Sequence, residues 1–295
     1  MKSTKKIMLI CGIFVISVSL SYFYGLVSHK YYLQPFPQIL YIKNRLFPES
    51  IGYADLSSRK PAPCSEIKGR GMMVALAFGQ SNSGNHGETL HRPARGVFNF
   101  YKGRCYVAED PLLGATGDRG SIWSRLGDLL VRLGLYDAVV IIPIGVGTTT
   151  VDQWTKGGYL HSRIVNAIRE SGAGGLKITH LFWVQGGSEK RTNGDGVNKE
   201  NYKTNFSTML RNIRNLGVQA PMYIAVSTYN GTDCNRDIQK AQRELVDGNN
   251  NVFAGPDDDQ LLQDPANRWE QVHLSNQGLD RCALAWLAAI RRAGK

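Results

Sequence analysis

The stretch Met72-Met73-Val74-Ala75-Leu76-Ala77-Phe78-Gly79-Gln80-Ser81-Asn82 is an unbroken apolar run that ends in glycine and small polar residues. A short apolar run bounded by turn residues is typical of a strand that is buried on both faces, as in a parallel sheet. Similar runs recur at residues 138–143, 178–184, 222–227 and, more briefly, 252–254. These five runs predict the strands of one sheet.

Amphipathic segments lie between and after these runs. Residues 201–216 carry apolar side chains at helical spacing, and residues 276–292 repeat the pattern. Shorter helix candidates are residues 121–133, 159–171 and 236–247. Alternating strands and helices predict an α/β fold, a three-layer α/β/α sandwich around a parallel five-stranded sheet. Binding sites in such sheets form at the carboxyl ends of the strands, so the residues that follow each run are the functional candidates.

The N-terminal part has a different composition from the rest of the chain. Residues 7–27 (IMLICGIFVISVSLSYFYGLV) carry no charge and, as a helix, are long enough for roughly 30 Å of hydrocarbon. Lys2, Lys5 and Lys6 precede them, which favours a cytoplasmic N-terminus and an exported C-terminal part. A cleaved signal peptide is the alternative, but no small-x-small cleavage site follows the run. We therefore expect a cytoplasmic tip and single-pass transmembrane anchor over residues 1–27, a stalk over 28–68, and a folded domain over 69–295 on the periplasmic, extracellular or lumenal side.

Charge and cysteine content narrow the function classes. The formal net charge is +11, but the basic residues are scattered along the chain, so nucleic-acid binding is not expected. Four cysteines lie outside the N-terminal apolar run, and we expect Cys64 to pair with Cys105 and Cys234 with Cys282. An unpaired core thiol at Cys282 is the alternative. No His and Cys cluster has zinc-type spacing, so we expect no metal and no cofactor.

Two strand-end segments contain glycine turns beside possible reacting groups. Gly79-Gln80-Ser81-Asn82 places a serine on a tight turn that a substrate can approach closely. The second segment, residues 145–154, is a glycine-containing loop whose backbone amides can point at a developing oxyanion. Taken singly, the first segment also fits a turn with a capping serine, and the second a strand-to-helix turn with hydroxyl caps.

The third and fourth segments add an amide and a base. Gln185 follows the third predicted strand and can donate its side-chain amide to the same oxyanion. His273 precedes the last predicted helix, where it can act as general base toward Ser81, and Glu270 can bond its other ring nitrogen. Each residue alone also fits a loop cap or a surface histidine. Together, the four segments supply the parts of one acyl-transfer site.

In order and position the four segments resemble the SGNH hydrolase superfamily, and within it the sialate O-acetylesterase and plant-type carbohydrate acetylesterase group. The resemblance covers about residues 70 to 292 and implies a flavodoxin-like sheet. Gly79-Gln80-Ser81-Asn82 matches the first block of the group in full. The other blocks each differ at one position: Thr148 stands where glycine is usual, Gly187 where glutamate is usual, and Glu270 where aspartate is usual.

The resemblance implies a serine esterase that removes O-acetyl groups from carbohydrate, a surface polysaccharide or glycan, through an acyl-enzyme. It implies Ser81 as the nucleophile, His273 as the base and Glu270 as the acid of a triad. Asp264, or a dyad without an acid, is the alternative to Glu270. The implied oxyanion hole consists of the Ser81 and Gly147 amides together with Gln185.

Further expectations concern the substrate and the outcome of the reaction. The residues expected to contact the acetylated carbohydrate are Asn82, His86, Trp154 and Ser188. An O-acetyltransferase acting on polysaccharide is one alternative, because the same site can pass the acyl group to a sugar hydroxyl. A catalytically silent carbohydrate-binding scaffold is another, motivated by the departures at positions 148, 187 and 270.

Overall fold

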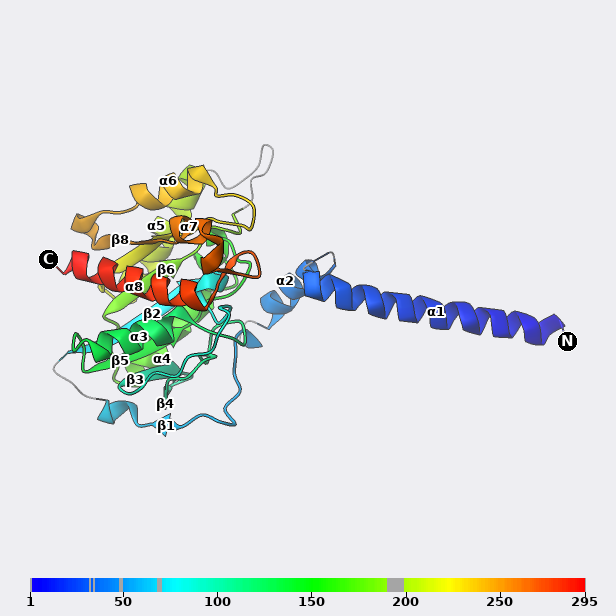
Figure 1. Ribbon diagram of the computed structural model, residues 1–295, viewed down its shortest axis with the longest axis horizontal. Coiled ribbons are helices and arrows are strands. Elements are labelled where there is room, and N and C mark those ends of the chain that lie inside the picture. Colours follow the sequence, from blue (N-terminus) through cyan, green and yellow to red (C-terminus); the bar gives the residue numbers. More distant parts are fainter. Residues whose placement is uncertain are drawn as a thin grey trace. The chain divides into compact units, whose positions relative to one another are not determined.

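An eight-stranded sheet lies at the centre of residues 51–295 in this computed structural model (Figure 1). The structure describes residues 2–31, 33, 35–47, 50–67, 71–189 and 199–294, with the side chains of the two N-terminal helices described only in part. Within these residues the strand order is β1-β4-β3-β5-β2-β6-β7-β8. The strands are β1 (Pro61–Ala62), β2 (Met72–Gly79), β3 (Val97–Tyr101), β4 (Arg104–Val107), β5 (Ala138–Pro143), β6 (His180–Val184), β7 (Met222–Val226) and β8 (Val252–Asp257).

The sheet is mostly parallel, and the five predicted strands are present as β2, β5, β6, β7 and β8. The predicted number of five was wrong, because three further strands extend the sheet beyond β5. β3 pairs parallel to β5, whereas β4 and then β1 add in antiparallel orientation. These three strands are not continuous apolar runs: β1 has two residues, and β3 and β4 contain Asn99 and Arg104.

Helices cover both faces of the sheet, as the alternating pattern predicts. Along β2, the side chains of Met73, Ala75 and Ala77 join the core under α3 (Ile122–Arg132) and α8 (Asn276–Ala293). The side chains between them join the core under α4 (His161–Ala173), α5 (Lys199–Asn215) and α6 (Arg236–Glu244). α3 and α8 lie side by side in Figure 1, and the short helix α7 (Asp258–Gln263) contacts α8. The result is the three-layer arrangement, with β2 buried between the two helical layers.

The N-terminal unit, Met1–Ser50, contains α1 (Lys2–Tyr31) and α2 (Phe36–Leu46). Among the residues whose side chains are described, no helix is both long enough and apolar enough to cross a membrane. The transmembrane anchor expected over residues 1–27, and the membrane as a partner, are therefore not supported. The side chains of residues 7–13, which form part of the apolar run, lie outside the described residues.

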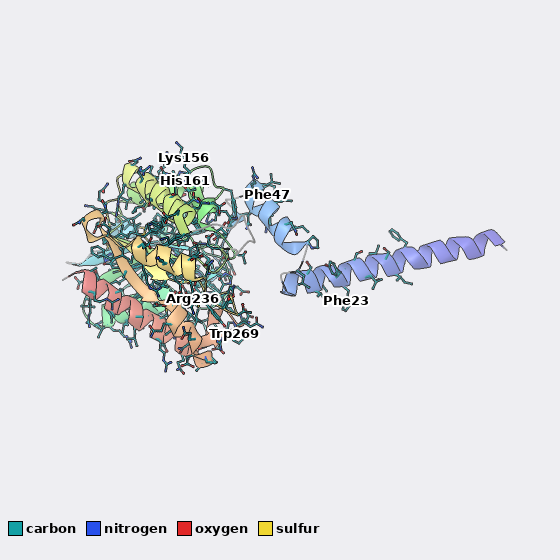
Figure 2. All side chains as sticks on the ribbon, turned by 90° about the horizontal axis from the view of Figure 1, so that it is seen from above. Phe23, Phe47, Lys156, His161, Arg236 and Trp269 are labelled. Carbon is teal, nitrogen blue, oxygen red and sulfur yellow. A yellow bond between two sulfur atoms is a disulfide. The ribbon has the colours of Figure 1, made fainter. Side chains whose placement is uncertain are left out.

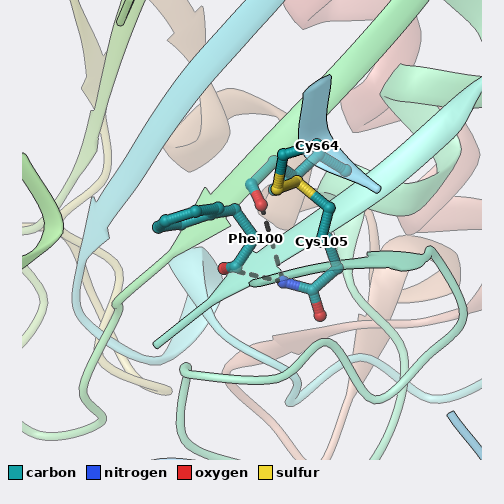
Figure 3. The surroundings of a disulfide bond; sticks show 5 residues. Cys64, Phe100 and Cys105 are labelled. Carbon is teal, nitrogen blue, oxygen red and sulfur yellow. Dashed lines mark hydrogen bonds between the residues drawn. A yellow bond between two sulfur atoms is a disulfide. The ribbon is translucent and has the colours of Figure 1, made fainter. Parts of the chain in front are cut away.

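The disulfide pattern bears out one expected pair and overturns the other. Cys64, just after β1, is bonded to Cys105 in β4, with their Cα atoms 5.3 Å apart (Figure 3). The pairing of Cys234 with Cys282 was wrong, since neither forms a disulfide within the described residues. Cys282 is buried in the core between α8 and the sheet, whereas Cys234 precedes α6, which packs on the opposite face.

Candidate active site

The candidate site lies where the strand order reverses. β5 pairs with one side of β2, and β6, the next strand in the chain after β5, pairs with the other side. The crevice outside the carboxyl ends of such strands is the usual binding site of an open α/β sheet. Ser81 begins the short 3-10 helix η3 (Ser81–Ser83), two residues after the end of β2, and is partly exposed.

The first and third segments are joined through Gln80. Its backbone N–H donates to the Val184 carbonyl at 2.8 Å. Its side-chain Oε1 accepts from the N–H groups of Gly186 and Ser188, each at 3.2 Å. Gly79 has φ +125°, and a Cβ there would overlap the Val184 carbonyl, so only glycine fits this junction. The turn that carries Ser81 is therefore fixed against the end of β6.

Gly147, in the second segment, lies beside Ser81. A Cβ built on Gly147 would be 3.7 Å from the Ser81 Cβ and 3.5 Å from the His86 ring. The Gly147 N–H, expected to hold an oxyanion, donates to Thr116 Oγ1 at 2.8 Å. Thr148 follows with φ +57°, the left-handed region that glycine adopts freely and a β-branched residue does not. This conformation explains why glycine is usual at position 148 in the group that the sequence resembles.

Gln185, the predicted third oxyanion donor, is fully buried, and among the described residues its Oε1 has no hydrogen-bond partner. Its Nε2 donates to the Thr149 carbonyl at 3.0 Å and to Glu189 Oε1 at 2.5 Å. The structure therefore does not leave this amide free to face Ser81. Instead, Gln185 is hydrogen-bonded to the backbone of the second segment, at Thr149.

Glu189 is a residue that the sequence analysis did not single out. It is 4% exposed and also accepts from the Val151 N–H at 2.7 Å. Burial raises the pKa of its carboxyl to about 7, although the hydrogen bonds from Val151 and Gln185 oppose that shift. At Gly187, where glutamate is usual, a Cβ would lie 2.8 Å from the Tyr229 carbonyl oxygen. The buried carboxylate of this segment thus comes from position 189, four residues after Gln185.

The four expected substrate contacts differ in position. Trp154 is fully buried, and its Nε1 donates to Thr149 Oγ1, so it belongs to the core and does not reach a cleft. Asn82 is largely buried and donates to the Val272 carbonyl at 3.3 Å. Ser188 is partly exposed beside Gln80. His86 lies beside His273 and Gly147.

His273 and Glu270 sit on a hairpin formed by β9 (Arg268–Trp269) and β10 (His273–Leu274), and Trp269 is labelled in Figure 2. His273 Nδ1 lies 3.7 Å from Glu270 Oε2, and the two side chains are 15% and 58% exposed. Among the described residues, Nδ1 has no hydrogen-bond partner. Burial lowers the pKa of His273, and the Glu270 carboxylate opposes that shift.

Asp264, the alternative acid, binds other groups than His273. Its Oδ1 accepts from the Ala266 N–H at 3.0 Å as a helix cap, and its Oδ2 forms an ion pair with Arg281 Nη1 at 3.0 Å. The hydrogen bond from the Ala266 N–H, together with the Arg281 guanidinium, holds the pKa of this carboxyl below its ordinary value. Of the two candidate acids, Glu270 is the one placed next to His273.

His86 stacks on His273, with ring centroids 5.0 Å apart. Its Nε2 lies 3.1 Å from Thr116 Oγ1. Burial, and to a lesser extent the neighbouring His273, lower the pKa of His86 to about 3, so this imidazole is neutral at physiological pH. Ser81, Gly147, His86, His273 and Glu270 therefore form one cluster, which has a hydroxyl, a backbone donor and a base. In the part of the chain that is described, no three His, Cys, Asp or Glu residues are grouped as metal ligands.

Comparisons with known proteins identify the family of this chain. A family model described as carbohydrate esterase, sialic acid-specific acetylesterase, matches residues 126–285, more than half of the chain. The match includes Gly147, Gln185 and His273 and begins after Ser81. A probable carbohydrate esterase of Arabidopsis thaliana is 28% identical over 116 residues, which are 39% of this chain and 44% of that protein. The aligned part therefore spans less than half of that relative.

Solved structures share the fold. The X-ray structure of the same Arabidopsis protein matches with a TM-score of 0.58 at 18% identity and covers 74% of this chain and 98% of that one. The crystal structure of NanS matches with a TM-score of 0.51 at 14% identity and covers 75% and 97% of the two chains. At these identities the likeness shows the α/β fold alone.

Proposed function

Because this chain belongs to the sialic acid-specific acetylesterase family of carbohydrate esterases, we propose that it removes O-acetyl groups from carbohydrate through an acyl-enzyme on Ser81. One hydrogen bond is the main reason for choosing Ser81 and His273 as the reacting pair. The Asn82 side chain bonds the Val272 carbonyl, which ties the residue after Ser81 to the residue before His273. This bond, between residues 190 positions apart, brings together the segments that carry the predicted nucleophile and the predicted base.

The proposed reaction has two halves. Ser81 Oγ attacks the acetyl carbonyl carbon while its proton passes to His273 Nε2, and that proton then leaves with the sugar oxygen. Water attacks the resulting acetyl-Ser81 ester with His273 again as base, which releases acetate and restores the serine. The first half requires a hydrogen bond from Ser81 Oγ to His273 Nε2 when substrate is bound. Such catalytic bonds often form only with substrate present.

Supporting groups stabilise the charges that develop. The Ser81 amide holds the oxyanion of the tetrahedral intermediate, which also shares the Gly147 N–H with its present acceptor, Thr116 Oγ1. Glu270 orients His273 through Nδ1 and stabilises the imidazolium, for which the carboxylate must move closer than its present 3.7 Å. Gln185 supports the loop that carries Gly147, a role that replaces the donor role expected from the sequence.

Hydrolysis of p-nitrophenyl acetate and of an O-acetylated sugar tests the proposal. We expect Ser81→Ala and His273→Ala to lower kcat by about 10³-fold or more, as for other catalytic triads. Ser162→Ala, at an exposed position in α4, is the matched control and should leave kcat unchanged. Full turnover by Ser81→Ala would refute the nucleophile. Transfer of acetyl to an added sugar, with no acetate release in its absence, would identify an acetyltransferase instead.

The Cys64–Cys105 disulfide supports a further proposal, that the enzyme works outside the cytoplasm. Disulfides persist in oxidising compartments and are rare in the cytosol. Alkylation of the protein in freshly lysed cells tests the location. Cys64 and Cys105 should be labelled only after reduction, and labelling of both without reductant would place the protein in a reducing compartment.

A further inference from the structure

We propose that Thr116 and His86 are positioning residues, which hold the Gly147 amide in place as an oxyanion donor. The inference rests on the proposed esterase function and goes beyond it. It starts from the chain of contacts Gly147 N–H, Thr116 hydroxyl and His86 imidazole, which joins the second segment to a loop that leads away from Ser81.

The backbone of Thr116 is fixed from both sides. Its N–H donates to the Gly145 carbonyl at 2.9 Å, and its carbonyl accepts from the Asn85 N–H at 2.8 Å. It therefore bridges the loop that carries Gly147 and the loop that carries His86. With the backbone held in this way, the hydroxyl is directed into the space between Gly147 and His86.

The direction of the hydroxyl proton depends on the His86 tautomer. Thr116 Oγ1 accepts the Gly147 N–H at 2.8 Å, and its single proton can go to His86 Nε2 at 3.1 Å or to the Gly145 carbonyl at 3.5 Å. The nearer acceptor is His86. Such a chain needs a bare Nε2, which places the His86 proton on Nδ1. Successive hydrogen bonds of this kind polarise and strengthen one another.

His86 is suited to be a fixed acceptor. A Cβ built on Gly84 or Gly117 would lie 3.2 or 3.0 Å from its Cδ2 atom, so both glycines pack tightly against the ring. Its other neighbour is the His273 ring. A neutral ring at this position does not repel the imidazolium that forms on His273 during the reaction.

The contact with Thr116 preorganises the Gly147 N–H, because it fixes the amide before substrate binds. An oxyanion donor is effective when it points at the developing charge before the reaction begins. Gly147 has no side chain of its own to fix its amide, and it precedes the strained residue Thr148. The Thr116 oxygen fixes the direction of the N–H, and we expect the oxyanion to share that N–H in a three-centre hydrogen bond.

Replacement of Thr116 is the direct test, with p-nitrophenyl acetate as substrate and the full chain as enzyme. Thr116→Val keeps the shape and removes the hydroxyl, and we expect kcat to fall about tenfold or more, with KM changed less than twofold. Thr116→Ser keeps the hydroxyl and should restore most of kcat. Unchanged or increased kcat in Thr116→Val would overturn the proposal, and so would failure of Thr116→Ser to exceed Thr116→Val.

A double-mutant cycle tests the chain itself. His86→Phe keeps a ring beside His273 but cannot accept from Thr116, so we expect a kcat loss similar to that of Thr116→Val. Because both changes break one chain, the double variant should be little worse than either single variant. Fully additive losses would overturn the coupling. Ser81→Ala in the same assay separates the two proposals, since full activity there would refute the esterase mechanism rather than the role of Thr116.

Discussion

Glu270 lies in an unfavourable backbone conformation next to the proposed base. It has φ +46° and Gln271 has φ +70°, so two consecutive residues other than glycine occupy the left-handed region. These residues form the turn of the β9–β10 hairpin, and tight hairpin turns commonly use residues with positive φ. The observation that favours Glu270 as the triad acid is therefore its 3.7 Å distance to His273.

Removal of the Glu270 charge should change both the rate and its pH dependence. Glu270→Gln should lower the plateau of kcat/KM about 10- to 100-fold, because the imidazolium loses its partner. The carboxylate raises the pKa of His273 against the effect of burial. Without it the pKa falls further, the histidine stays neutral to lower pH, and the acidic limb of the profile moves to lower pH.

Asp264→Asn is the control for this pH profile. Because Asp264 pairs with Arg281, its neutralisation should leave both the plateau and the acidic limb of kcat/KM in place. A larger effect from Asp264→Asn than from Glu270→Gln would move the acid role to Asp264.

Thr148 offers a test of strain that is independent of activity. It has φ +57°, and its hydroxyl donates to the Gly147 carbonyl at 2.7 Å, which partly compensates. Thr148→Gly should raise the free energy of unfolding by about 0.5–1 kcal/mol, as measured in urea, since glycine adopts this conformation without steric penalty. Thr148→Val keeps the branched shape and loses the hydrogen bond, so it should be less stable than the native protein. A destabilised glycine variant would contradict this account.

The positions of these residues were more predictable than their roles. Ser81, Gly147 and His273 were identified because glycine turns and strand ends can be located in a sequence. The orientation of Gln185 could not be predicted, because it depends on Glu189, whose carboxylate takes the amide that was expected to face Ser81. Trp154 was expected at the cleft, but an aromatic residue near a loop gives no sign of whether it packs outward or into the core.

At the level of elements, the apolar runs predicted the central strands and missed the edge. Asn99 in β3 is buried, and its side chain bonds both the N–H and the carbonyl of Leu113. A polar residue that finds its partners in a distant loop breaks the apolar pattern without breaking the strand. β1 has two residues and is held by pairing with β4 and by the Cys64–Cys105 bond, so its own composition carries no strand signal.

The disulfide should therefore stabilise this edge of the sheet. It joins residues 41 positions apart, and removal of a bond that closes a loop of that size lowers stability by about 3–4 kcal/mol in the chain-entropy account. We expect the variant Cys64→Ala, Cys105→Ala to lose about that free energy of unfolding and to keep kcat at 25 °C. Dithiothreitol should bring the native protein to the stability of the variant and leave the variant unchanged. A variant that is still destabilised by dithiothreitol would show that another bond is responsible.

At the scale of the whole molecule, the chain divides into two units, Met1–Ser50 and Ile51–Lys295. The boundary places residues 51–67 with the enzyme unit, and their contacts explain why. Arg59 donates to the carbonyls of Glu109 and Pro111, at 2.6 and 2.5 Å, and Arg163 donates to the Ile51 carbonyl at 2.9 Å. From the sequence we expected residues 51–67 to be part of a stalk, because they are rich in Pro, Ser and charged residues. Hydrogen bonds to backbone carbonyls, which hold these residues on the domain, cannot be recognised from hydropathy.

These contacts reach the proposed site. The Tyr53 N–H donates to the Ala115 carbonyl at 2.7 Å, and the Tyr53 carbonyl accepts from the Gly114 N–H at 2.8 Å. Gly114 and Ala115 are the two residues before Thr116. Residues 51–67 therefore support the loop whose hydroxyl binds the Gly147 amide.

Two truncated proteins test this connection. A fragment of residues 51–295 keeps the core, the disulfide and the Tyr53 contacts, so its kcat and melting temperature should match those of the full chain. A fragment of residues 69–295 lacks β1, Cys64 and Tyr53. It should melt several degrees lower, since one degree corresponds to a few tenths of a kcal/mol in a domain of this size. Its kcat should also fall, in the same direction as that of Thr116→Val, because the Thr116 loop loses its support. Equal kcat in the two fragments, measured well below both melting temperatures, would show that residues 51–67 stabilise the fold without shaping the site.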